Sequence, residues 1–193
     1  MPTPERTSLA AIVLAGREIL ESAGLSGLTM QAVAERVGVK APSLYKRVRD
    51  REALIIAVSE SVLDDLSTDL ERIEHSRDPD DDDRIAARRL LSDLAVAYRA
   101  FAQSQPEGFR LMFTASAPLA SLDRASGPVL RASAALVGDD HALDAARLIT
   151  AWMTGFLQME LAGAFRLGGD VDQAFDYGLE HLLSGLHPEN ART

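Results

Sequence analysis

The chain has 193 residues, of which 47% are hydrophobic and 25% are charged, so it is long enough and apolar enough to bury a core. It contains no cysteine, which excludes disulfide bonds, thiolate metal sites and catalysis by a cysteine nucleophile. The amino-terminal residues lack the pattern of a secretory signal, and no stretch is apolar enough to span a bilayer. We therefore expect a soluble, cytoplasmic protein with no membrane partner.

The net charge of −9 is unevenly divided along the chain. Residues 1–51 carry eight basic and five acidic side chains, a net charge of +3. Residues 52–193 carry twelve basic and twenty-four acidic side chains, a net charge of −12. This asymmetry favours a basic segment that contacts nucleic acid, attached to an acidic body, although salt screens charges beyond about 8 Å.

An amphipathic helix is predicted first, between a capping residue at Thr7 or Ser8 and a stop at Ala23-Gly24. A second, short helix begins after Thr29, whose hydroxyl suits an N-cap, and ends at Gly38, which tolerates a left-handed backbone. Three of its residues have the spacing of an inward face: Val33, Ala34 and Val37.

A third helix starts almost at once, with Pro42 suited to its first position and with Val39 and Leu44 directed against the second helix. The side chains left to face outward are Lys40, Ala41, Ser43, Tyr45, Lys46 and Arg47. Between residues 40 and 51 five side chains are basic and only Asp50 is acidic. Such a helix pair is also a common αα-hairpin, and a basic cluster is often only a solvated surface. Position and charge together favour a helix-turn-helix whose last helix enters the DNA major groove.

This segment resembles the N-terminal domain of the TetR family of bacterial transcription regulators. The matching residues are Thr29, Gly38, Val39, Tyr45, Arg51 and Leu54. Arg47-Val48 stand where the family often has His-Phe, so phosphate contact and packing at this pair must differ. We expect DNA contacts, to bases or phosphates, from Thr29, Gln31, Lys40, Ala41, Ser43, Tyr45, Lys46, Arg47 and Arg51.

The rest of the chain is also predicted to be helical. A long helix is expected from Asp50 to Ile73, followed by helices at about 84–103, 106–116, 119–137, 141–167 and 171–186. The acidic run 78–83 is interpreted as a solvated loop. A calcium loop is disfavoured because Asp83 and Arg89 stand where an EF-hand needs glycine and glutamate. The prediction is an all-α protein, with a three-helix DNA-binding domain at 1–51 and a helical bundle at 52–193.

The stretch 151–170, with Trp152 and Gly155, resembles the family's WHG-type C-terminal domain, although Thr154 stands where histidine is usual. The two resemblances together cover most of the chain. They imply a homodimer whose last two helices pair across a two-fold axis, and an effector pocket inside each body. The residues considered for pairing are Phe156, Leu157, Leu161, Phe175, Leu179, Leu182 and Leu183.

Residues considered for the effector pocket are mostly bulky and apolar, which suggests a small hydrophobic effector. They are Tyr98, Phe101, Phe109, Met112, Phe113, Trp152, Met153, Phe156, Met159 and Glu160. Each apolar member could equally be ordinary core, and the division between pocket and pairing surface stays open. A carboxylate at Glu160 on this apolar helix is costly unless it contacts a ligand, lies at an exposed rim or pairs with an arginine across the dimer.

No enzyme is expected. The four histidines have no metal-binding spacing, no nucleophile elbow occurs, and Gly168-Gly169 follow a helix and not a strand. No cofactor or metal is expected either. The sequence predicts a ligand-released homodimeric repressor that places residues 29–51 of each copy in successive major grooves of a palindromic operator. The alternative is an architectural or adaptor DNA-binding protein that responds to no ligand.

Overall fold

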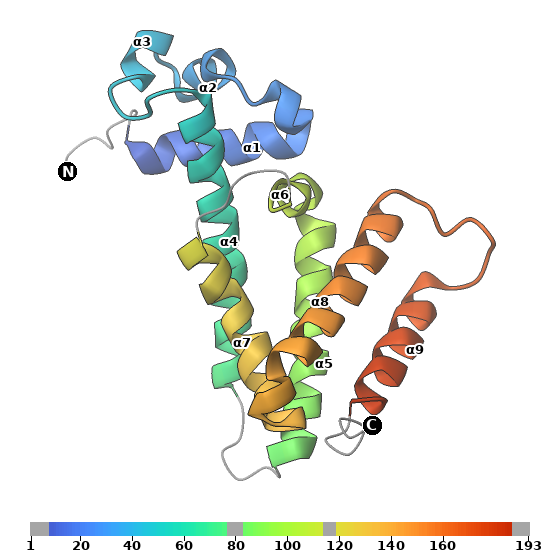
Figure 1. The fold of residues 1–193 in the computed structure, drawn as a ribbon. Helices are drawn as coiled ribbons and strands as arrows, with labels where there is room; N and C mark the ends of the chain where they lie inside the picture. The colour runs from blue at the N-terminus through green and yellow to red at the C-terminus, as the bar shows by residue number, and fades with distance from the viewer. Residues whose placement is uncertain (1–7, 77–82, 114–118, 187–193) are drawn as a thin grey trace. The chain divides into compact units, whose positions relative to one another are not determined.

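The computed structural model describes residues 8–76, 83–113 and 119–186 (Figure 1). Within these ranges the chain forms nine α-helices and no strand, which confirms the all-α prediction. The acidic run 78–83 lies outside the described residues except for Asp83, which begins a helix. The helices are α1 Leu9–Gly27, α2 Met30–Val37, α3 Ala41–Leu44, α4 Arg51–His75, α5 Asp83–Ser104, α6 Pro106–Leu111, α7 Leu119–Val137, α8 Asp139–Leu161 and α9 Val171–Ser184.

The chain divides into two compact units. The first unit comprises residues 1–65 and 104–122, and the second comprises residues 66–103 and 123–193. The helices α4 and α7 each begin in the first unit and end in the second, and α5 belongs to the second unit except for its last residue, Ser104. Helix α6 therefore packs with the N-terminal helices despite its distance from them in the sequence.

An apolar core holds the first unit together. Ile12, Val33, Leu44, Leu54 and Val58, from α1 to α4, are completely excluded from solvent. Burying each such side chain stabilises the fold by about 1.5–3 kcal/mol. The short helices α2 and α3 are thus fixed against α1 and the beginning of α4.

The second unit has a separate core. Along α8 the buried residues recur every three or four positions: Ala142, Ala145, Ile149, Met153 and Leu157. Along α9 they are Phe175, Leu179 and Leu183. Helical spacing reveals an apolar face but does not say whether the chain's own core or a partner covers it.

Four of the residues considered for subunit pairing must therefore be reassigned. Leu157, Phe175, Leu179 and Leu183 are buried within their own chain, so they cannot form a pairing surface. Phe156, Leu161 and Leu182 are half-buried.

Helix α1 begins as predicted, because Ser8 accepts a hydrogen bond from the Ala11 amide at 3.1 Å. The stop predicted at Gly24 is a kink. Gly24 leaves the helical conformation (φ 66°, ψ −178°), but helical structure continues to Gly27. None of the described helices is both long enough and apolar enough to cross a membrane.

Two helices are shorter than predicted. The helix expected at 106–116 ends at Leu111, and the helix expected at 141–167 ends at Leu161. Gly163 adopts φ 61° and donates to the Glu160 carbonyl, while the Ala164 amide donates to the Met159 carbonyl, both at 2.9 Å. This pair of hydrogen bonds is a Schellman motif, which ends a helix.

Candidate functional site

The connection between α2 and α3 has the geometry of a helix-turn-helix. The Thr29 hydroxyl accepts a hydrogen bond from the Ala32 amide at 3.1 Å and caps α2, as predicted. At its other end Gly38 is left-handed (φ 75°, ψ 36°), and the amides of Gly38 and Val39 donate to the carbonyls of Glu35 and Ala34. These bonds turn the chain sharply, so α3 starts three residues later.

Helix α3 is a single turn, Ala41–Leu44, with Pro42 as its second residue and not its first. Leu44 and Val48 are buried in the first unit's core. Their side chains attach one side of the segment 40–48 to this core, and the opposite side of the segment faces solvent.

Most of the side chains predicted to contact DNA lie on this open side. Lys40, Tyr45, Lys46 and Arg47 are exposed, and Tyr45 exposes 54% of its surface although it is aromatic. Ala41 and Ser43, on the first turn of α3, are half-buried. The arrangement presents three cations and a phenol on a surface whose small residues permit close approach by a ligand.

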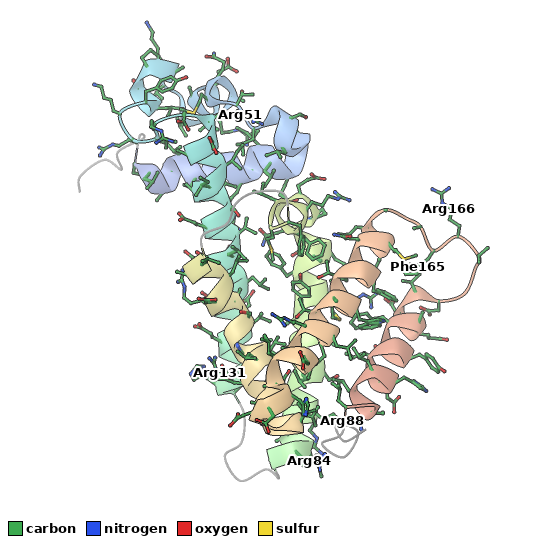
Figure 2. All side chains as sticks on the ribbon, viewed as in Figure 1. Arg51, Arg84, Arg88, Arg131, Phe165 and Arg166 are labelled. Carbon is green, nitrogen blue, oxygen red and sulfur yellow. The ribbon has the colours of Figure 1, made fainter. Side chains whose placement is uncertain are left out.

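Three other predicted DNA contacts already have partners within the chain. The Thr29 hydroxyl oxygen caps α2, and the Gln31 amide donates to Glu35 Oε1 at 2.6 Å. Arg51, at the start of α4 (Figure 2), donates through Nε to the Leu28 carbonyl at 2.7 Å and through Nη2 to the Leu25 carbonyl at 2.6 Å. Arg51 thus ties α4 to the end of α1.

A polar junction joins α1 to α6. No sequence pattern indicated this contact. The Glu21 carboxylate accepts hydrogen bonds from the amides of Gly108 at 2.7 Å and Glu107 at 3.2 Å, in the first turn of α6. These amides have no partner within their own helix, and the positive end of the helix dipole favours a carboxylate there.

Arg17, one turn before Glu21 on α1, extends this junction to α4. Its guanidinium contacts Asp65 at 2.5 Å, Ser61 at 3.2 Å and Gln105 at 2.7 Å. The first unit therefore fixes residues 105–108 through two charged side chains of α1.

The residues considered for an effector pocket are divided between the two compact units. Phe109, Met112 and Phe113 belong to the first unit, where Phe109 is fully buried and contacts Phe113 edge to face at 5.3 Å. Phe101 and Met153 are buried in the second unit, and Met159 is exposed.

An aromatic cluster links α8 and α9 in the second unit. Trp152 lies 5.5 Å from Phe156 and 5.7 Å from Phe175, measured between ring centroids. Phe165, beyond the end of α8, adds a further contact with Phe156 at 4.9 Å. A Cβ atom at Gly178 would lie 2.4 Å from Trp152 Cζ2, so only glycine lets α9 approach this ring.

Thr154, which stands where the family that the sequence resembles usually has histidine, hydrogen-bonds the Tyr98 hydroxyl. Burial raises the pKa of Tyr98 to about 12, and the hydrogen bond to Thr154 opposes this shift. The phenol therefore remains neutral, and Thr154 is its polar partner.

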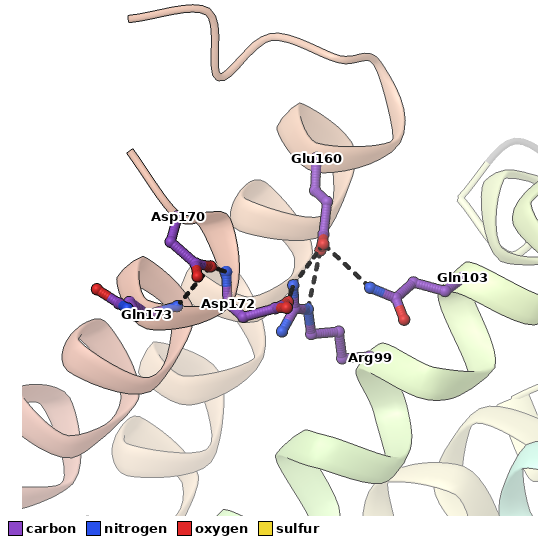
Figure 3. Close-up of polar contacts among 6 residues, drawn as sticks. All are labelled: Arg99, Gln103, Glu160, Asp170, Asp172 and Gln173. Atoms are coloured by element: carbon purple, nitrogen blue, oxygen red, sulfur yellow. Dashed lines mark hydrogen bonds and ion pairs between the residues drawn. The ribbon is translucent and has the colours of Figure 1, made fainter. Parts of the chain in front are cut away.

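The partner of Glu160 is an arginine of the same chain, and no arginine across a dimer is needed (Figure 3). Arg99 donates to both carboxylate oxygens of Glu160, at 2.5 and 3.0 Å, and to Asp172 at 2.6 Å. Gln103 donates to Glu160 at 3.0 Å, and the Arg99 guanidinium lies 4.5 Å from the Phe175 ring centroid. With only 12% and 16% of their side chains exposed, Arg99 and Glu160 form a compensated, nearly buried pair.

A groove of about 580 Å³ lies between α5 and α9. Its walls include Arg88, Val96, Asp176 and Leu179, and none of the residues considered for the effector pocket lines it. Arg88 reaches across to the Ser184 hydroxyl at 2.8 Å.

The sequence matches two protein-family models. Residues 12–58 match the model described as bacterial regulatory proteins of the tetR family. Residues 91–182 match the model described as the tetracycline repressor-like C-terminal domain. The first match contains the whole of residues 30–48, which we call the α2–α3 segment. The second match contains the aromatic cluster and the Arg99 network.

Individual relatives show the same similarity. An uncharacterized HTH-type transcriptional regulator of Mycobacterium tuberculosis is 31% identical over 192 residues, which covers 95% of this chain and 83% of that protein. The class A tetracycline repressor from transposon 1721 of Escherichia coli is 28% identical over 84% of this chain and 73% of the repressor. The crystal structure of a TetR variant from Acinetobacter baumannii AYE in complex with minocycline has a TM-score of 0.70 at 24% identity, covering 95% of this chain and 97% of that one. At this identity the structural likeness concerns the fold alone.

Proposed function

Because the chain belongs to the TetR family of bacterial transcriptional regulators, we propose that it is a homodimeric repressor that leaves a palindromic operator when a small effector binds. Regulators of this family bind DNA, form dimers and bind small-molecule effectors. The observation that carries the proposal is the open side of the α2–α3 segment. It presents Lys40, Tyr45, Lys46 and Arg47 to solvent above a buried apolar core.

Residues 1–51 are assigned to DNA binding and residues 52–193 to effector binding and dimerisation. Lys40, Tyr45, Lys46 and Arg47 are exposed, so they can reach phosphates and base edges, while Ala41 and Ser43 allow α3 to enter the major groove. Thr29 and Gln31 would contact phosphate from the start of α2. Arg51 would do so through Nη1, since Nε and Nη2 bind the chain's own carbonyls.

The effector is assigned to the second unit, next to Tyr98, Trp152, Thr154 and Phe156. The rings supply apolar surface, and the Tyr98–Thr154 pair supplies neutral hydroxyls. Glu160 is already neutralised by Arg99, so it is available to a cationic ligand only if that ion pair breaks. We infer an uncharged, largely apolar effector.

Dimerisation is assigned to the outward faces of α8 and α9. On α8 the exposed residues Leu148, Ala151, Gly155 and Met159 form one stripe, and no atom lies within 4 Å of a Cβ placed on Gly155. On α9 the exposed Tyr177 stacks on His181 at 3.9 Å. Small residues within an apolar stripe let a second helix approach closely.

Release from DNA requires that the effector bind two states of the dimer unequally. We propose that the polar junction of Arg17 and Glu21 with residues 105–108 transmits this change, together with α4. The junction fixes α6 to α1, the first helix of the DNA-binding domain. An effector that displaces α6 would then change the position of α1.

The proposal is tested by incubating the purified protein with fragmented genomic DNA and sequencing the retained fragments over a salt series. Retention of one palindromic site, with affinity that falls steeply with salt, is the expected result. Salt-sensitive binding without sequence preference would favour the architectural alternative. Absence of binding would contradict both.

A further inference from the structure

Residues 162–170, which join α8 to α9, form a loop that is exposed along its whole length. We call these residues the arm. Three glycines in left-handed conformations bend it: Gly163 (φ 61°), Gly168 (φ 82°) and Gly169 (φ 90°). Leu167, just before Gly168, exposes 104% of its reference area, so its side chain does not pack against the chain's own core.

Both ends of the arm are fixed to the second unit. Arg99 binds Glu160 in the last turn of α8 and Asp172 in the first turn of α9, so one guanidinium holds both ends (Figure 3). Near its start Phe165 packs on Phe156, with 4.9 Å between the ring centroids. Side-chain contacts therefore hold the base of the arm against α5, α8 and α9.

Local hydrogen bonds also shape the outer part of the arm. Arg166 Nε donates to the Gly163 carbonyl at 3.2 Å, and Asp170 caps α9 by accepting from the Asp172 amide at 2.8 Å. Figure 2 shows Arg166 projecting away from the helices. The arm thus presents one large apolar side chain and one cation, on a backbone that is held at both ends.

Two observations indicate what the arm contacts. The stripe of Leu148, Ala151, Gly155 and Met159, which we assign to the dimer interface, runs along α8 to the start of the arm. Residues 52–193 carry a net charge of −12, so the body of a second copy is electrostatically complementary to Arg166.

We propose that the arm clasps the second subunit of the homodimer, where Leu167 is buried and Arg166 pairs with a carboxylate. The inference rests on the proposed homodimer and adds a contact outside the paired helices. The α8–α9 loop then helps to hold the two subunits together.

Analytical ultracentrifugation of Leu167→Asp tests this proposal, with Leu14→Asp as a matched control. Leu14 is also exposed, at 59%, but lies on α1 in the first unit. Since burial of a leucine is lost, the dimer dissociation constant should rise at least about tenfold for Leu167→Asp and stay unchanged for Leu14→Asp. An unchanged constant for Leu167→Asp overturns the proposal.

A third variant separates failure of the arm from failure of the homodimer. Gly155→Arg places a long cation in the α8 stripe and should dissociate the dimer. If Gly155→Arg dissociates the dimer and Leu167→Asp does not, the arm proposal is wrong and the homodimer stands. If the wild-type protein is a monomer, both proposals are wrong.

Cross-linking gives an independent test, because the chain contains no cysteine. Leu167→Cys labelled with a benzophenone maleimide should form a covalent dimer on irradiation, whereas labelled Leu14→Cys should not. Equal cross-linking from both positions, or none from position 167, contradicts the proposal.

Discussion

At the scale of single residues, exposure decides which side chains of the α2–α3 segment can meet DNA. Leu44 and Val48 are buried, while Tyr45, Lys46 and Arg47 between them are exposed. The exposed side chains can therefore be replaced with little effect on folding, and their effect on DNA binding can be measured separately.

Lys46→Ala and Tyr45→Ala should both weaken operator binding while the melting temperature stays the same. If Lys46 binds a phosphate, the slope of log affinity against log salt should fall by about one, because fewer counterions are released. Fluorescence anisotropy over a salt series measures this slope. Arg72→Ala, which removes an exposed cation of the second unit, is the control. Wild-type affinity and slope in both variants would refute the assignment of this segment.

Glu74 makes a pH-dependent contribution to stability. The hydrogen bonds from Arg131 Nε and Nη2, at 2.7 and 2.6 Å, hold the pKa of Glu74 below its ordinary value of 4.5. A carboxyl whose pKa is lowered by folding stabilises the protein above its unfolded pKa, and this stabilisation disappears as the pH falls through the folded pKa.

We therefore expect Glu74→Gln to lower the free energy of unfolding at pH 7 by about 1 kcal/mol or less, since the pair is partly exposed. The difference from wild type should shrink as the pH falls below 4.5, the ordinary pKa of this carboxyl. Urea denaturation at pH 7 and pH 4 measures both values. A difference that grows with acidity would contradict this assignment.

Sequence alone predicted the residues whose surroundings are local. The outward positions of Lys40, Tyr45 and Lys46 follow from helical spacing next to a glycine turn. The partners of Arg51 and Glu160 did not follow, because the Leu25 carbonyl lies 26 residues from Arg51 and Arg99 lies 61 residues from Glu160. No periodicity within a helix reports such contacts.

At the scale of helices, α6 depends on α1 for its start. Gln105 provides no side-chain cap, and Glu21 accepts the hydrogen bonds of the first-turn amides instead. The attachment of α6 to the first unit is thus partly electrostatic.

Glu21→Gln should expose these amides. We expect faster hydrogen exchange at Glu107 and Gly108 and a loss of about 1–2 kcal/mol in the free energy of unfolding, because two hydrogen bonds lose a charged acceptor. Glu18→Gln, one turn earlier on α1 and paired with Arg36 at 2.6 Å, is the control. Unchanged exchange in Glu21→Gln would show that the junction does not hold α6.

Gly178 sets the approach of α9 to the Trp152 ring. Gly178→Ala would place a methyl group 2.4 Å from Trp152 Cζ2, so the ring must move, and we expect a loss of about 1–3 kcal/mol. Trp152 is the single tryptophan, so its fluorescence reports the change directly. In Gly185→Ala the nearest atoms lie at 3.5 Å or more, and fluorescence should not change. Matching spectra for both variants would argue against this packing.

Helix starts and ends were predictable where a capping residue marks them, as at Ser8, Thr29 and Gly38. The end of α8 was placed six residues too late, because Phe165 and Leu167 continue the apolar spacing beyond Leu161. Gly163 was the available signal for the earlier stop. That α6 packs with the N-terminal helices depends on long-range contacts and could not be inferred.

At the scale of the whole molecule, the two units match the division of labour that we propose. The first unit contains the exposed cations of the α2–α3 segment, and the second contains the aromatic cluster, the Arg99 network and the arm. Two copies would present two α2–α3 segments, and a two-fold axis between them requires half-sites of matching symmetry.

The most direct test of this account is to measure operator affinity as a function of half-site spacing, on the site recovered from genomic DNA. Inserting about 5 base pairs turns one half-site to the opposite face of the duplex, since successive major grooves are about 10–10.5 base pairs apart. The account predicts that this insertion lowers affinity at least about a hundredfold, to the level of a single half-site. Affinity that is indifferent to the insertion would contradict a symmetric dimer reading two major grooves through α2 and α3.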